Sequence, residues 1–202
     1  MKAIIAGGGI AGLTLANVLE KAGIDFVLLE ARALLDPQVG ASIAIAPSSM
    51  RIFDQFGAAQ EIIDQTTPIK WGRHHRKDGS LIMPPSPSMQ VLEARFGYGI
   101  SFLDRQLVLR ALANSVQRQD KMLLNKRVKN IWHLEQGVVV ECEDGSSYDG
   151  DIVIGCDGVH SKIRQEMWRL AAEDSPDHFP DNERGSKSII QMRQASTDIY
   201  QK

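Results

Sequence analysis

Residues 2–30 read KAIIAGGGIAGLTLANVLEKAGIDFVLLE, and their pattern of apolar residues and glycines predicts the fold class. Residues 2–6 form a short apolar run that ends at a glycine, which is typical of a buried parallel strand. Apolar residues then recur at helical spacing from Leu15 to Ala22, and residues 25–30 form a second apolar run. Strand, helix and strand within about 30 residues predict a right-handed βαβ unit and an α/β, Rossmann-like fold.

The turn between the first strand and the helix carries a Gly-x-Gly-x-x-Gly motif at Gly7, Gly9 and Gly12. Gly7 is expected to allow the tight turn, Gly9 the approach of a pyrophosphate, and Gly12 close helix–strand packing. The start of the helix would then present free N–H groups to the phosphates. Glu30 ends the second strand 18 positions after Gly12, where an acid accepts hydrogen bonds from ribose hydroxyls.

Each of these features also has a simpler interpretation when it is taken alone. The glycines could form a plain tight turn, and Glu30 could be an exposed acid at the end of a strand. Together in a βαβ frame they predict dinucleotide binding, and an acid at Glu30 argues against a 2′-phosphate and therefore against NADP in this pocket. The motif does not separate FAD from NAD.

Farther along the chain, apolar runs and turn residues predict the remaining elements. A hairpin is expected over residues 69–83, with its turn at residues 77–79. Asp104 and Ser161 are good N-caps for the last two helices. Strands are predicted over 41–47, 98–103, 122–125, 128–134, 138–143 and 151–156, and helices over 48–56, 105–117 and from Ser161 onward.

A second motif, CDGVHSKIR at residues 156–164, separates FAD from NAD. With its preceding apolar strand, it resembles the Asp-Gly fingerprint of the aromatic-hydroxylase class of flavoprotein monooxygenases, on Asp157, Gly158, Ser161 and Arg164. The resemblance implies an FAD-binding domain in which Asp157 lies near the cofactor. A simple strand–turn–helix joint would explain the segment alone, and whether Asp157 contacts FAD or only braces the turn stays open.

The same family places an arginine at the start of the helix that Arg105 opens here, in FLDRQLVLRAL, and that arginine reaches the FAD. An arginine fork suits a pyrophosphate or ribityl neighbour. Where the family usually has a glycine near the flavin, this chain has Ala44, whose methyl group could crowd the cofactor. The expected cofactor-binding residues are therefore Gly7, Gly9, Gly12, Glu30, Ala44, Arg105 and Asp157, while the catalytic residues stay unassigned.

Within that class the chain is most similar to fungal FAD-dependent monooxygenases of indole-diterpene, meroterpenoid and related pathways. IAGGGIAGLTLANVLEKAGIDFVLLEAR, EARFGYGISFLDRQ, LLNKRV, GCDGVHSKIR and EMWRLA carry this similarity, which runs from Met1 to about Pro180. The resemblance implies an oxidoreductase that inserts one oxygen atom, by epoxidation or hydroxylation, into a prenylated, terpenoid or aromatic metabolite. NAD(P)H would supply the electrons and O₂ the oxygen atom.

The family's Gly-Asp motif, which contacts the ribityl region of FAD, would fall beyond residue 202. We therefore expect an FAD-binding domain over residues 1–170, with part of a mixed or antiparallel substrate-side sheet at about 66–103, and an irregular tail over 171–202. Alternatives are a truncated, non-catalytic FAD-binding remnant, a partner of a complementing chain, or an NAD-dependent oxidoreductase.

Composition excludes several other classes of protein. The 202 residues are 43% hydrophobic and 24% charged with a net charge of −2, which fits a globular domain and no nucleic-acid partner. The uncharged run after Lys2 contains three consecutive glycines, Gly7 to Gly9, so we expect neither a signal peptide nor a transmembrane helix. Two cysteines without a CxxC pattern indicate a reducing, cytoplasmic setting, and His74-His75 lacks the ligands of a metal site.

Overall fold

The computed structural model describes residues 1–37 and 42–174. A four-stranded parallel sheet forms its centre, with the strand order β5-β2-β1-β9. Strand β1 pairs with β2 on one side and with β9 on the other, and β2 pairs with β5. These strands are β1 Lys2–Ala6, β2 Asp25–Leu29, β5 Met122–Leu123 and β9 Ile152–Gly155. The βαβ unit that residues 2–30 predict is confirmed.

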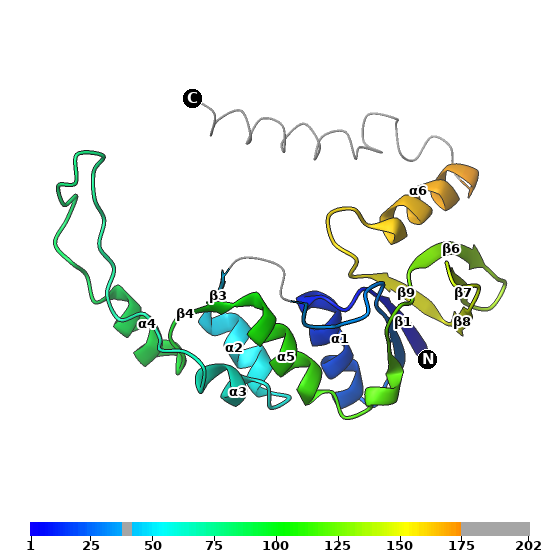
Figure 1. Ribbon diagram of the computed structural model, residues 1–202, viewed down its shortest axis with the longest axis horizontal. Coiled ribbons are helices and arrows are strands. Elements are labelled where there is room, and N and C mark those ends of the chain that lie inside the picture. Colours follow the sequence, from blue (N-terminus) through cyan, green and yellow to red (C-terminus); the bar gives the residue numbers. More distant parts are fainter. Residues whose placement is uncertain (38–41, 175–202) are drawn as a thin grey trace.

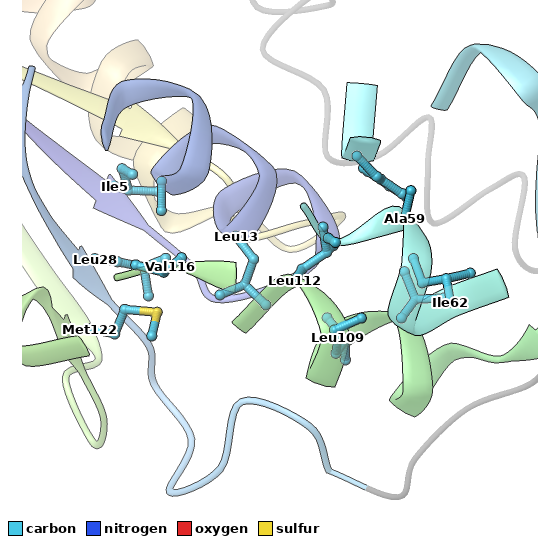
Figure 2. Packing of buried hydrophobic residues seen from close by; sticks show 14 of the residues in the cluster. Ile5, Leu13, Leu28, Ala59, Ile62, Leu109, Leu112, Val116 and Met122 are labelled. Atoms are coloured by element: carbon cyan, nitrogen blue, oxygen red, sulfur yellow. The ribbon is translucent and has the colours of Figure 1, made fainter. Parts of the chain in front are cut away.

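One face of the sheet packs against two helices, α1 (Ile10–Lys21) and α5 (Arg105–Ser115). Because side chains alternate along a strand, Ala3 and Ile5 of β1 point to this face. Figure 2 shows Leu13 of α1 in the same cluster as the strand residue Leu28 and as Leu112 of α5. This cluster is the main hydrophobic core, and it fixes the position of both helices relative to the carboxyl ends of the strands.

The opposite face of the sheet packs against an antiparallel meander and the last helix. The intervening side chains of β1, Ile4 and Ala6, pack there with Ile131 and Val140. The meander consists of β6 Val128–His133, β7 Val138–Cys142 and β8 Ser147–Gly150, and α6 spans Lys162–Asp174. The fold is therefore a three-layer α/β arrangement, as Figure 1 shows.

Buried Glu166 helps to hold α6 on the meander. Its carboxylate pairs with Lys162 at 2.8 Å and with Arg169 at 3.0 Å. Arg169 also donates to the carbonyl oxygen of Ile131 in β6 at 3.1 Å. Because a buried carboxylate needs such partners, this group indicates that α6 is held firmly against β6 of the meander.

The remaining elements extend from α5, away from the sheet. Strands β3 (Ser42–Ile45) and β4 (Ser101–Asp104) form a two-stranded antiparallel ribbon. Helices α2 (Pro47–Asp54) and α3 (Ala59–Ile63) pack beside it, and α4 spans Ser88–Phe96. Figure 1 shows the segment before α4 reaching far from the sheet.

The hairpin predicted over residues 69–83 is present, with its turn at residues 77–79, since Arg76 N donates to Ser80 O at 2.7 Å and Ile82 N donates to His74 O at 2.8 Å. It contains only isolated bridges, between His75 and Leu81 and between Gly72 and Ser86, and no regular strands, because an isolated hairpin is marginal without a sheet to join. Helices α3 and α4 were not predicted, although the Pro87 that precedes α4 and the left-handed Gly97 that ends it are typical helix boundaries.

The carboxyl-terminal region contains two further differences. The Asp144-Gly145 turn leads into β8 and not directly into the last strand, because the polar sequence SYDG of β8 carries no apolar signal. Helix α6 runs to Asp174, four residues past the boundary predicted at residue 170, and its Arg169–Glu173 pair at 2.9 Å supports the last turn. The rest of the predicted tail lies outside the described residues.

Candidate cofactor site

A cavity of about 480 Å³ opens at the carboxyl ends of the parallel strands. It lies where β1 is flanked by β2 on one side and β9 on the other, the place where open α/β sheets bind nucleotides. The carboxyl ends are joined directly, since Gly7 N donates to Leu29 O at 2.8 Å and Cys156 N donates to Ala6 O at 2.7 Å. Its walls include the glycine loop, residues 30–37, the start of α5, residues 126–128 and the Asp157 turn.

Two of the three motif glycines are required by the loop itself. Gly7 has a φ of +107°, and a Cβ there would lie 2.5 Å from the carbonyl oxygen of Cys156. A Cβ on Gly12 would lie 1.9 Å from the carbonyl oxygen of Gly7 and 3.3 Å from the Cβ of Cys156. Gly12 therefore allows the helix to approach its own loop as well as the neighbouring strand.

Gly9 is different, because a Cβ there would make an ordinary van der Waals contact and no clash. The nearest atom within the described part of the chain would be a terminal nitrogen of Arg105, at 3.7 Å. Gly9 is also the N-cap residue of the 12-residue helix α1, whose first N–H groups have no partner within the helix. This combination of free space, free donors and a positive helix end suits a diphosphate.

Glu30 is half-buried at the end of β2 and lines the cavity. Its Oε2 accepts a hydrogen bond from Gly8 N at 2.6 Å, and its Oε1 accepts one from Arg32 N at 2.8 Å. These two bonds hold the carboxylate against the glycine loop. Each oxygen keeps a second lone pair, so the group can still accept hydrogen bonds from a pair of hydroxyls.

Arg105 is the first residue of α5 and lies half-buried in the cavity lining. Within residues 1–37 and 42–174, no ion pair or hydrogen bond engages its guanidinium, whereas Lys126 and Arg127 pair with Asp144 and Glu143. A cation without a carboxylate partner beside a helix start can bind an anionic group. Asp104 occupies the predicted N-cap position but makes no capping hydrogen bond.

The Asp157 carboxylate has two distinct environments. Its Oδ2 accepts hydrogen bonds from Lys162 N at 2.6 Å and Ile163 N at 3.1 Å, so it caps α6. Its Oδ1 is buried and has no partner among the described residues. Because this oxygen has no surface exposed to the cavity, the geometry shows Asp157 bracing the turn beside the cavity, and its contact with the cofactor stays a prediction. Ser161 also caps α6, as predicted, by accepting from Arg164 N at 2.9 Å.

Of the predicted cofactor residues, Gly12 is not among those that line the cavity, because it packs against its own loop, and Ala44 lies on a separate element. It is exposed on β3, opposite Phe102 of β4, and is not among the residues that line the cavity. Its contact with the cofactor stays a prediction. Both cysteines are free, and burial raises the pKa of both the Cys142 and Cys156 thiols. In the described ranges no cluster of ligands could hold a metal ion, and no helix is long and apolar enough to cross a membrane.

Sequence analysis missed two parts of the cavity wall, residues 31–37 and residues 126–128. The first follows β2 directly and the second follows β5, the neighbouring parallel strand. Since adjacent parallel strands end at the same edge of a sheet, the positions of these segments could have been inferred from the topology. Their individual side chains carry no motif that marks them.

The FAD binding domain family matches residues 1–175 of this chain, and the chain belongs to that family. Its similarity to fungal FAD-dependent monooxygenases, expected from the motifs, is confirmed. The FAD-dependent monooxygenase ausM of Penicillium brasilianum is 46% identical over 176 residues, which cover 87% of this chain and 37% of that protein. The FAD-dependent monooxygenase verC1 of Penicillium polonicum is also 46% identical, over 87% of this chain and 22% of that protein.

Solved structures agree with this assignment. HpxO of Klebsiella pneumoniae, solved with FAD and uric acid, has a TM-score of 0.69 and 28% identity, over 81% of this chain and 41% of that one. The p-nitrophenol 4-monooxygenase PnpA of Pseudomonas putida DLL-E4 shares the fold at a TM-score of 0.71 and 24% identity, over 82% of this chain and 42% of that one. The cofactor expected from the sequence, FAD, is confirmed. The chain spans well under half the length of these proteins.

Proposed function

We propose that this chain supplies the FAD site of a monooxygenase that inserts one oxygen atom, by epoxidation or hydroxylation, into a prenylated, terpenoid or aromatic secondary metabolite. NAD(P)H is the electron donor, O₂ the oxidant, and the cytoplasm the compartment. The observation that carries the proposal is the convergence on one cavity of the Glu30 carboxylate, an uncrowded helix start and Arg105, a cation with no carboxylate partner among the described residues. Bound FAD would supply the redox chemistry with NAD(P)H and O₂.

The residues of the cavity divide the work of holding FAD. Glu30 accepts hydrogen bonds from the ribose hydroxyls, while Gly9 and the start of α1 receive the diphosphate. Arg105 neutralises the diphosphate or contacts the ribityl chain. Asp157 caps α6 and holds the turn that lines the cavity beside the cofactor. Ala44 is assigned to the flavin end of FAD.

The first experiment is an FAD titration of the purified 202-residue chain, followed by flavin absorbance. We expect saturable binding with a Kd of about 10 μM or tighter. Arg105→Ala should raise the Kd about tenfold, because it removes a charge-assisted contact to the cofactor. Arg95→Ala, which changes an exposed arginine of α4 outside the cavity, is the matched control. Absence of any flavin signal with the wild-type chain would refute the proposal.

The oxygenase part of the proposal needs a separate measurement. Oxygen uptake and NADH or NADPH oxidation are followed with the FAD-loaded chain, with peroxide measured as the product of uncoupled turnover. Oxidation of either nicotinamide that depends on FAD supports the proposed activity. Tight FAD binding without nicotinamide oxidation would favour the alternative, a non-catalytic FAD-binding chain or one that acts with a complementing chain.

A further inference from the structure

The outer wall of the cofactor cavity is the segment that follows β2, residues 31–37. Ala31, Arg32, Leu34, Leu35 and Pro37 of this segment line the cavity. Leu35 packs inward against the main core, and its Cδ2 lies 2.6 Å from the position that a Cβ on Gly8 would take. The wall therefore rests directly on the glycine loop, and a displacement of the wall would change the width of the cavity.

Asp36, which does not line the cavity, attaches this wall to α5. Arg110 Nε donates to Asp36 Oδ2 at 3.0 Å, and Gln106 Nε2 donates to the backbone oxygen of Asp36 at 2.9 Å. The Arg110 and Asp36 side chains are 48% and 29% exposed. Water screens the partly exposed ion pair. The second hydrogen bond, from Gln106, is neutral, and it fixes the backbone of the same residue.

Helix α5 presents two pairs of residues, each with a spacing of four, to the two sides of the wall. Arg105 and Leu109 line the cavity, whereas Gln106 and Arg110 hold Asp36 from outside. Residues four apart lie on the same side of a helix, so the two pairs run along adjacent stripes. One rigid helix thus determines both where Arg105 lies and how far the wall stands from it.

We infer that Asp36, Gln106 and Arg110 are positioning residues for FAD, a clamp that holds wall 31–37 at the distance from Arg105 and the glycine loop that the ADP half of FAD requires. The inference rests on the proposed binding of FAD in this cavity. None of the three residues contacts the cavity, so they act through Leu35 and its neighbours in the wall. Loss of the clamp widens the cavity and speeds the release of FAD.

The test compares Arg110→Gln and Gln106→Ala with the wild-type chain in FAD affinity, FAD dissociation rate and competition by ADP. We expect each substitution to raise the Kd for FAD about fivefold, with the inhibition constant of ADP changing by the same factor. Arg110→Lys, which keeps the cation, should restore most of the affinity. Glu93→Gln removes the exposed Lys70–Glu93 pair, which lies outside the cavity lining, and is the control.

Thermal unfolding of the FAD-free proteins separates positioning from a merely structural role. A positioning role predicts that the Tm of FAD-free Arg110→Gln stays within about 2 °C of wild type while the Kd rises. Unchanged FAD and ADP binding in both variants would overturn the inference, and so would a Tm loss that accounts for the weaker binding. A wild-type chain that binds no FAD is a different result, because it refutes the proposed function itself.

Discussion

The glycines of the loop after β1 have the same motif role in the sequence but different physical roles in the molecule. Gly12 faces the carbonyl oxygen of Gly7 at a distance that leaves no room for a methyl group. A Cβ on Gly9 would clash with nothing in the folded protein, since Arg105 Nη2 would lie 3.7 Å from it, and its φ of −76° is accessible to any residue. Gly12 is therefore needed by the folded protein, and Gly9 by the ligand.

This difference predicts opposite outcomes for two single-methyl substitutions. Gly12→Ala should destabilise the FAD-free protein by about 3 kcal/mol, because the loop or the helix must move. Gly9→Ala should leave its Tm within about 2 °C of wild type and raise the Kd for FAD at least about tenfold, since the methyl group occupies the place assigned to the diphosphate. Thermal unfolding and FAD titration of both variants measure the two effects.

Ala11→Ser, at an exposed position of α1, is the control for a small change near the motif. If Gly9→Ala bound FAD as tightly as wild type, the diphosphate could not lie over Gly9 and the assignment of the helix start would be wrong.

Helices α1 and α5 are joined by a buried polar contact as well as by apolar packing. Asn17, 2% exposed, donates through Nδ2 to Leu13 O and to Leu112 O, each at 2.9 Å. Its Oδ1 accepts from Ser115 Oγ at 2.9 Å. Because α1 starts at the glycine loop and α5 starts at Arg105, this contact helps to set the distance between the two.

Asn17→Ala should lower the free energy of unfolding by about 2 kcal/mol, because it removes all three hydrogen bonds of a buried side chain and leaves Ser115 Oγ as the side-chain donor to the Leu112 carbonyl. Urea denaturation measures this loss, and Lys21→Ala on the exposed part of α1 is the control. A change of less than about 0.5 kcal/mol would show that water or a neighbouring donor replaces the amide.

The turn between β7 and β8 depends on an ionised carboxylate. Asp144 accepts hydrogen bonds from Ser146 N at 3.1 Å and Ser146 Oγ at 2.6 Å, and it pairs with Lys126. The Lys126 ammonium, and then the Ser146 donors, hold the pKa of Asp144 far below its ordinary value of 3.8. The ionised form is therefore favoured by folding, and the turn is stabilised only while Asp144 keeps its charge.

The sign of the pH effect follows from this lowered pKa. Stability from Asp144 is fully present above the unfolded value near 3.8 and is lost as the pH falls through the lower, folded pKa. Asp144→Asn should therefore be less stable than wild type at pH 7, and the difference should shrink below about pH 4. Urea denaturation between pH 3 and pH 7 tests this, with Asp120→Asn as the control, and a difference that stays constant with pH would contradict it.

For the molecule as a whole, the segment between α3 and α4 is the part that stands out from the body. Trp71, Leu81, Ile82 and Met83 are about half exposed, and Arg73, Arg76 and Lys77 are exposed beside them. Its backbone contains isolated bridges and a few hydrogen bonds around the turn, and no regular strand. A protease should reach this segment before it reaches the sheet.

Limited trypsin digestion should therefore cut first after Arg73, Arg76 or Lys77, with the products identified by mass spectrometry. Saturating FAD should not slow these cuts, because none of these residues lines the cavity, but it should slow any cut after the exposed Arg32 of the cavity wall. If FAD slowed the cuts after Arg73, Arg76 and Lys77 as much as the cut after Arg32, it would act on global stability. If FAD did not slow the cut after Arg32, the result would argue against binding in this cavity.

The length of the apolar pattern in each segment determined whether its helix or strand could be predicted from the sequence. Strands β1, β2 and β9 and helices α1 and α5 have continuous apolar patterns, so their existence and approximate bounds were predicted. Helix α3 has five residues and β8 is polar, so neither has a pattern long enough to recognise. The hairpin predicted at 69–83 forms without regular strands, because no neighbouring strand of a sheet extends its pairing.

The βαβ unit and the FAD cofactor could be predicted from the sequence alone, because they depend on local backbone geometry and short motifs. The same motifs also predicted candidate cofactor-binding residues, among them Gly7, Gly9, Gly12, Glu30, Arg105 and Asp157. The arrangement of distant segments shows that Asp157 caps α6 with one oxygen, while its other oxygen is buried without a hydrogen-bond donor among the described residues. It also shows that Ala44 lies outside the cavity lining. It also decided that α5 holds the cavity wall through Asp36. These features involve residues that are distant in sequence, or they depend on the direction of single side-chain atoms. No local sequence pattern encodes either property.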